Sequence, residues 1–182
     1  MGEYLNPANL LTSSTLACGF LALILATEGE LGWAAAAVGT AAGLDILDGV
    51  AARRLAGGGG GFGANLHSLA DLLSFGAAPA LALYLSVLQE IPIAGIAACL
   101  AFVVCGAWRL ARFRLVKCPG RFVGLPIPPA GIAVVLLAAL GPPAGLALAA
   151  TLALTLLMVS DLPFPTSSPL DGRTPVDDQP LE

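Results

Sequence analysis

The sequence predicts an all-α integral membrane protein with about six transmembrane helices, and composition is the first reason. Hydrophobic residues make up 57% of the 182 residues and charged residues only 11%, whereas soluble domains average about half and about a quarter. Aromatic residues account for 6%, so Ala, Leu, Val and Ile supply most of the apolar weight. The 22 glycines and 14 prolines also suit helices packed in lipid. This balance argues against a soluble globular protein.

The second reason is the spacing of the apolar runs, because a membrane-spanning helix needs about 20 mainly apolar residues. Six such runs occur, at 8–27, 32–55, 66–88, 91–113, 127–141 and 143–160. A Gly-Pro-Pro sequence at 141–143 separates the last two, which form either a tight helical hairpin or one broken helix. We therefore expect a transmembrane domain over 1–162. The segment 163–182 is rich in Pro, Ser, Asp and Thr, which predicts a disordered cytoplasmic tail.

The distribution of basic residues predicts how the helices are oriented. Seven of the eight Lys and Arg residues lie at 53–54 and 109–121, whereas the opposite loops contain Glu28, Glu30 and Glu90. By the positive-inside rule the basic loops are cytoplasmic, and an even number of spans places both termini there too. We expect a multi-pass protein of the cytoplasmic membrane with its active site facing the cytoplasm. A net charge of -4 leaves no basic face for nucleic acid.

Two other features favour structural interpretations. The four cysteines occur singly and without CxxC spacing, so we expect them to be small packing residues. The five glycines at 57–61 are typical of a flexible connector. A pyrophosphate cradle remains an alternative, although the Lys-Ser/Thr ending of a Walker motif is missing.

Carboxylates inside apolar helices indicate where the chemistry lies. Asp45, Asp48 and Asp71 fall in or beside apolar runs, where an unpaired carboxylate costs several kcal/mol. Asp45 and Asp48 are three apart and share a helix face, while His67 and Asp71 are four apart and share a face of the next helix. Clustered carboxylates repel one another unless a cation neutralises them, and hard oxygen ligands suit Mg²⁺ or Mn²⁺. The pattern predicts a divalent metal site.

The alternative for these aspartates is pairing with Arg53 and Arg54 at the cytoplasmic interface. Gly49, directly after Asp48, leaves the backbone open beside the carboxylates, where a phosphate group could approach. Its alternative role is close helix packing.

Two neighbouring segments give these residues a family context. The sequence DILDGVAAR at 45–53 is followed after nine residues by GANLHSLAD at 63–71. Together they resemble the signature of the CDP-alcohol phosphatidyltransferase family, D-x-x-D-G-x-x-A-R followed by G-x-x-x-D-x-x-x-D. One signature position differs, because His67 stands where the family has its third aspartate.

Further segments resemble the serine branch of that family, the CDP-diacylglycerol:serine phosphatidyltransferases. They are SLADLLSFG at 68–76 with APA at 78–80, RLARF at 109–113, and FVGLP at 122–126 with PPA at 128–130. NLLT at 9–12 resembles the opening P-N-L-L-T of the family, with Ala8 in place of the proline. The resemblance covers about residues 6 to 165.

The resemblance implies a six-helix homodimer embedded in the lipid bilayer. Its reaction is metal-dependent transfer of a phosphatidyl group from CDP-diacylglycerol to the hydroxyl of L-serine, which releases CMP and serves phospholipid biosynthesis. By motif position, Asp45, Asp48 and Asp71 would bind Mg²⁺ or Mn²⁺, and Asp71 would also be the general base. The implied CDP-diacylglycerol contacts are Gly49, Arg53, Asn9 and Thr12. Arg109 and Arg112 would neutralise phosphate or the serine carboxylate.

The histidine leaves several interpretations open. His67 replaces an anionic ligand with a neutral one, which weakens Mg²⁺ binding and favours Mn²⁺ or Zn²⁺. The chain is then a natural variant with one metal or another metal, an engineered variant of weakened turnover, or a catalytically lapsed relative. Alternative functions are the same chemistry with another acceptor alcohol, non-catalytic binding of the CDP-lipid, and transport.

Overall fold

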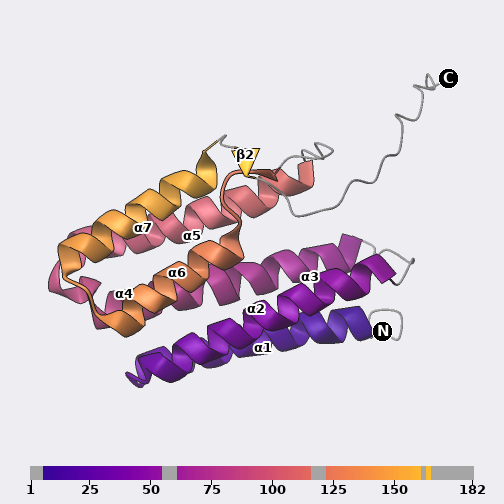
Figure 1. The fold of residues 1–182 in the computed structure, drawn as a ribbon, viewed down its shortest axis with the longest axis horizontal. Helices are drawn as coiled ribbons and strands as arrows, with labels where there is room; N and C mark the ends of the chain where they lie inside the picture. The colour runs from indigo at the N-terminus through magenta and orange to yellow at the C-terminus, as the bar shows by residue number, and fades with distance from the viewer. Residues whose placement is uncertain (1–5, 55–60, 116–121, 161–162, 165–182) are drawn as a thin grey trace.

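The fold is a bundle of helices whose bounds follow the apolar runs of the sequence. The computed structural model describes residues 6–54, 61–115, 122–160 and 163–164. The elements are α1 Pro7–Thr27, α2 Leu31–Arg54, α3 Gly61–Asp71, η2 Leu72–Ala77, α4 Ala78–Ser86, η3 Leu88–Glu90, α5 Pro92–Leu115, β1 Phe122–Val123, α6 Ile127–Leu140, α7 Ala144–Val159 and β2 Pro163–Phe164. Because α3, η2 and α4 follow one another without a break, the described residues form six helical rods (Figure 1).

The predicted all-α membrane fold is confirmed. Residues 7–27, 61–86 and 92–112 are long and apolar enough to cross a membrane, and α6 and α7 are shorter apolar helices. The third rod begins at Gly61, earlier than the expected residue 66. The last two runs form separate helices, so the hairpin interpretation is correct; Gly141 ends α6 with a φ of 61°, a left-handed conformation that glycine adopts without strain.

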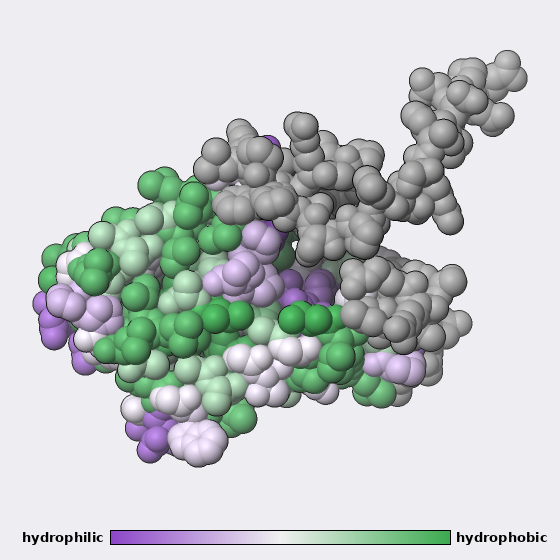
Figure 2. All heavy atoms as spheres, in the orientation of Figure 1, coloured by the Kyte–Doolittle hydropathy of each residue, from purple (hydrophilic) through white to green (hydrophobic). Residues whose placement is uncertain are grey.

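The third rod occupies the centre of the bundle. It packs against α1, α2, α5 and α6, whereas α1 lies along α2 and α5 lies along α7. More than half of its apolar window, 56%, is buried within the protein, compared with 28% for α1 and 22% for α5. The outer rods therefore present most of their apolar side chains outward, as expected for helices that face lipid. Figure 2 shows these hydrophobic side chains along the flanks of the bundle.

The central rod changes helical form directly after Asp71. The π-helix η2, Leu72–Ala77, joins α3 to α4. Proline at position 79 has no N–H to donate to the carbonyl of Phe75, and its ring crowds that carbonyl in a regular α-helix. A π-helical turn relieves this conflict. The local sequence thus explains why the irregular turn lies beside an acidic residue of the predicted site.

Close packing holds η2 in place from two sides. Ser74 is fully buried and its hydroxyl donates to the carbonyl oxygen of Thr15 at 2.9 Å, which ties η2 to α1. Gly19 of α1 lies against Ser74, and Gly131 of α6 lies against the backbone of Phe75. A Cβ added at Gly19 or Gly131 would stand 2.7 Å from the Cα of Ser74 or Phe75 respectively. Glycine at these two positions lets three helices meet.

The ends of the rods give the bundle two distinct sides. The start of α1, the end of α2, the start of α3 and the end of α5 all lie at the right of Figure 1. A short antiparallel pairing, of Phe122 with Phe164 and of Val123 with Pro163, joins β1 to β2. The ends of α2 and α5, which lead into the two predicted basic loops, therefore lie on one side of the bundle. Residues 165–182, most of the predicted tail, are outside the described part of the chain.

The described cysteines agree with a packing role. Cys18, Cys99 and Cys105 are half-buried free thiols in contact with the hydrophobic core. Cys118 and residues 57–60 of the predicted connector lie outside the described residues, and Gly61, its last glycine, is the first residue of α3.

We expect Gly19→Ala to destabilise the fold by about 1–3 kcal/mol, because the added methyl group would force α1 and η2 apart. Thermal unfolding in detergent measures this. Gly39→Ala is the control, since a Cβ at this helical position meets nothing within 4 Å. Equal unfolding temperatures for the two variants would contradict the packing argument.

Candidate metal centre and active site

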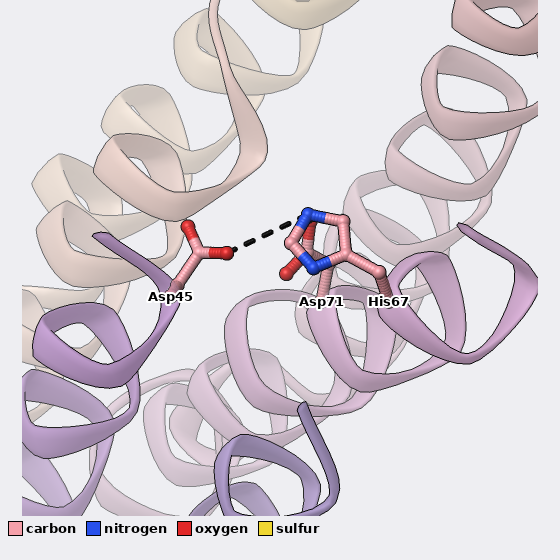
Figure 3. Close-up of side chains that lie close together, drawn as sticks. All are labelled: Asp45, His67 and Asp71. Atoms are coloured by element: carbon pink, nitrogen blue, oxygen red, sulfur yellow. Dashed lines mark ion pairs between the residues drawn. The ribbon is translucent and has the colours of Figure 1, made fainter. Parts of the chain in front are cut away.

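Four predicted site residues meet between the second half of α2, which carries Asp45 and Asp48, and the second half of α3, which carries His67 and Asp71. His67 Nε2 lies 3.5 Å from Asp45 Oδ1 and 3.6 Å from Asp71 Oδ2. The other ring nitrogen, Nδ1, lies 3.5 Å from Asp48 Oδ2. Figure 3 shows the imidazole ring of His67 between Asp45 of α2 and Asp71 of its own helix. The expected convergence of the two helix faces is therefore observed.

The donor set fits a divalent cation. Ligand atoms of Asp45, His67 and Asp71 all lie within 4.8 Å of one another. Asp71 is only 5% exposed, and its Oδ1 has no hydrogen-bond partner among the described residues. A buried carboxylate oxygen without a partner is costly, so this atom is available to a cation or a substrate proton. Carboxylate and imidazole donors together suit divalent metals.

Asp48 differs from the other two carboxylates because a third helix contacts it. The hydroxyl of Thr12 in α1 donates to Asp48 Oδ2 at 2.6 Å, and both side chains are buried. Hydrogen bonds to ionised groups are shorter and stronger than neutral ones. This bond joins α1 to α2 at the site, and it fixes the oxygen that faces His67 Nδ1.

Asn9 and Gly49, two of the predicted contacts of the nucleotide lipid, have different surroundings. Asn9 is buried, and a Cβ added at Gly63 would stand 2.9 Å from its Oδ1, so α3 starts against Asn9. Gly49 is different, because a Cβ there would meet nothing within 4 Å. The backbone of α2 at Gly49 therefore borders open space next to Asp48. The close-packing alternative for Gly49 finds no contact among the described residues.

The predicted arginines differ in burial and in their relation to Asp71. Arg109 of α5 is half-buried, its charge attracts that of Asp71, and its Nε is buried without a hydrogen-bond partner among the described residues. Arg112, about one turn further along α5, is exposed. Arg53 belongs to α2, but its side chain, like that of Arg54, is outside the described part. The alternative pairing of the aspartates with these two arginines therefore stays untested.

Sequence reasoning missed two features of the site. The contact of Thr12 with Asp48 joins residues 36 apart, and the only signal for it was the shared family segment at 9–12. The π-helix after Asp71 was also not expected, although the proline at 79 offered a signal.

Comparison with known sequences identifies the family. The sequence model of the CDP-alcohol phosphatidyltransferase family matches residues 5–161, which include every residue of the site. The chain belongs to this family of membrane-embedded proteins.

Its relatives include proteins of bacteria and archaea. The chain is 37% identical over 158 residues to the CDP-diacylglycerol–serine O-phosphatidyltransferase of Bacillus subtilis, covering 86% of this chain and 88% of the relative. It is 36% identical over 173 residues to the protein of the same name in Helicobacter pylori, covering 89% and 72%. It is 34% identical over 173 residues to the archaetidylserine synthase of Methanothermobacter thermautotrophicus, covering 91% and 72%.

We expect Thr12→Val to reduce stability by about 1.5–3 kcal/mol, because the substitution leaves a buried oxygen of Asp48 without its hydroxyl donor. Unfolding in detergent measures the loss. Thr151→Val is the matched control, since Thr151 is equally buried but its hydroxyl bonds only to the carbonyl of Ala147 in its own helix. A loss as large in the control would contradict a special role for the bond to Asp48.

Proposed function

We propose that this protein transfers a phosphatidyl group from CDP-diacylglycerol to the hydroxyl of L-serine, giving phosphatidylserine and CMP. The observation that carries the proposal is the convergence of Asp45, Asp48 and Asp71 at the signature position of a family to which the chain belongs. The names of its relatives in Bacillus subtilis and Helicobacter pylori specify the same reaction. The archaeal relative is also named for a serine lipid.

The reaction needs a base, and Asp71 is the residue suited to this role. The serine oxygen attacks the phosphorus attached to diacylglycerol, the bond from that phosphorus to the CMP oxygen breaks, and the serine proton must be removed. Asp71 is buried, and its Oδ1 has no partner among the described residues, so this oxygen can accept the proton. Arg109 beside it supplies positive charge that can hold Asp71 ionised or attract a substrate anion.

A divalent cation, Mg²⁺ or Mn²⁺, belongs to the proposal. Asp45, His67 and Asp71 would hold it, with Asp48 alongside. When bound, the cation would neutralise the negative charge of the pyrophosphate and the charge that develops on the phosphate of CMP as it leaves. The protein residues then have the tasks of positioning and proton removal, which make up most of phosphoryl-transfer catalysis.

Residues beside the carboxylates are suited to bind the nucleotide lipid. Gly49 borders open space, and Asn9 and Thr12 lie at the same end of the bundle near Gly63 and Asp48. We place the CDP-diacylglycerol pyrophosphate along this edge, with Arg53 as a further contact. Arg109 and Arg112 follow on α5 as candidates for the serine carboxylate.

The orientation and assembly also belong to the proposal. Five of the eight basic residues belong to the last turns of α2 and α5, at the end of the bundle that contains the site. This supports a site facing the cytoplasm and both termini on that side. We propose the cytoplasmic membrane as the location and a homodimer as the assembly.

The direct test is release of CMP by the purified protein in detergent. We expect release only when CDP-diacylglycerol and serine are both present, and Asp71→Asn to reduce it by at least about 100-fold, because general-base catalysis contributes about 10²–10⁴. Glu90→Gln, the same change at an exposed position, is the control. Release with glycerol phosphate or inositol phosphate in place of serine would reject the serine assignment.

Gly49→Ala tests the open edge of α2. We expect weaker binding of CDP-diacylglycerol, seen as a higher KM, because the methyl group would occupy space left for the substrate. Folding should not suffer, since the methyl group meets no protein atom within 4 Å and alanine is the better helix former by about 0.5–1 kcal/mol. Gly43→Ala is the control, with the same open surroundings further back on α2. An unchanged KM for Gly49→Ala would remove the glycine from the binding site.

His67→Asp tests whether the histidine limits the reaction with magnesium. We expect the substitution to raise Mg²⁺-supported CMP release by more than about tenfold, or about 1.4 kcal/mol in barrier, because a carboxylate restores a hard anionic ligand. Release that stays absent in both proteins, while CDP-diacylglycerol still binds, would favour the non-catalytic binding alternative.

A further inference from the structure

The two nitrogens of His67 face different surroundings, and this difference separates the three aspartates into two groups. Nε2 faces Asp45 and Asp71, at 3.5 Å and 3.6 Å. Nδ1 faces only Asp48, whose nearer oxygen already accepts the Thr12 hydroxyl at 2.6 Å. The ring thus divides the cluster into a trio around Nε2 and a carboxylate behind Nδ1.

We propose that this chain binds a single divalent transition-metal ion, such as Zn²⁺ or Mn²⁺, through Asp45, His67 Nε2 and Asp71. Asp48 is then not a ligand but the acceptor for the Nδ1 proton of His67. The inference rests on the proposed function only in that the reaction calls for a divalent cation. Relative to the proposed function, it specifies one ion, a transition metal in place of Mg²⁺, and a positioning role for Asp48 in place of metal binding.

Distances within the trio support one ion. Two ligands that each lie about 2.1 Å from one tetrahedral ion are about 3.4 Å apart. The Nε2 contacts of 3.5 Å and 3.6 Å are close to this separation, and all three ligand atoms lie within 4.8 Å of one another, so a small movement of the side chains brings them around one ion. A single imidazole nitrogen has one lone pair and cannot bridge two ions as a carboxylate can. The trio therefore holds one ion and leaves a position for a substrate oxygen.

The surroundings of Nδ1 support the role of Asp48. A histidine that binds metal through one nitrogen usually donates its other N–H to a carboxylate or carbonyl, which fixes the tautomer. Asp48 Oδ2 lies 3.5 Å from Nδ1, where it can take this role, and Thr12 holds it in position from α1. Zinc and manganese accept mixed nitrogen and oxygen ligands, whereas magnesium prefers oxygen alone. The ring thus selects against magnesium.

The test uses the fact that His67 is the only histidine of the chain. The full chain is purified in detergent with its affinity tag removed, stripped with a chelator, and titrated with Mn²⁺ or Co²⁺ alone. We expect one ion per chain, imidazole-nitrogen coupling in the pulsed EPR spectrum of bound Mn²⁺, and the intense visible absorption of four-coordinate Co²⁺. An equal concentration of Mg²⁺ should not displace either ion. His67→Asp should abolish the nitrogen coupling.

Matched amide variants separate the ligands from the positioning residue. Asp48→Asn should keep one ion per chain and the nitrogen coupling while weakening affinity by about 10–100-fold. Asp45→Asn removes a ligand and should weaken affinity further. Glu90→Gln, an exposed acid at the other end of the bundle, should bind as the native chain does. Size exclusion and helical circular dichroism confirm that each variant is folded.

The inference would be overturned by two ions per native chain, by no nitrogen coupling, or by equal losses for Asp48→Asn and Asp45→Asn. Absence of any bound ion would do so too, and would leave a protonated His67 as the cation that neutralises the carboxylates. CMP release measured on the same preparations keeps the two proposals separate. CMP release by a protein that does not bind one nitrogen-coordinated ion rejects only the metal assignment. Binding of one such ion without CMP release rejects only the proposed transferase function.

Discussion

The enclosure of three carboxylates in an apolar bundle, two of them buried and Asp45 half-buried, is the constraint on which the site depends. Each ionised carboxylate costs several kcal/mol in such surroundings, so Asp45, Asp48 and Asp71 require neutralising partners. Two polar contacts are visible, although neither group is a fixed charge: the imidazole of His67 lies between all three, and the Thr12 hydroxyl donates to Asp48. The cluster brings together α1, α2 and α3 at one end of the bundle. Its geometry determines both what the site can bind and where the helices meet.

Packing away from the carboxylates fixes the position of Asp71, the proposed base. Asp71 is the last residue of α3, and the π-helix that follows is held by Ser74 against α1 and by Gly131 against Phe75. A shift of η2 would move Asp71 relative to Asp45, which belongs to another helix. The central rod is also the most buried of the candidate spans, so it has little freedom to adjust. A rigid support suits chemistry that depends mainly on positioning.

Family membership and His67 determine different properties of this protein. The family, matched over residues 5–161, accounts for the fold and the reaction class. His67 alters the donor set within that reaction class, because a ring has two distinct nitrogens whereas a carboxylate has two equivalent oxygens. One substitution can therefore change which aspartates are ligands without changing the helices that bear them.

The sequence alone determined most of the helix bounds and which site residues share a helix face. Apolar runs of about 20 residues fixed the six rods to within a few residues, and spacings of three and four placed Asp45 with Asp48 and His67 with Asp71, because helical periodicity is local. Family resemblance identified the signature residues. Only the tertiary structure decided that Thr12 binds Asp48 and that the two ring nitrogens face different carboxylates. Such contacts join residues far apart in the chain, and their distances follow from helix packing, which no local spacing specifies.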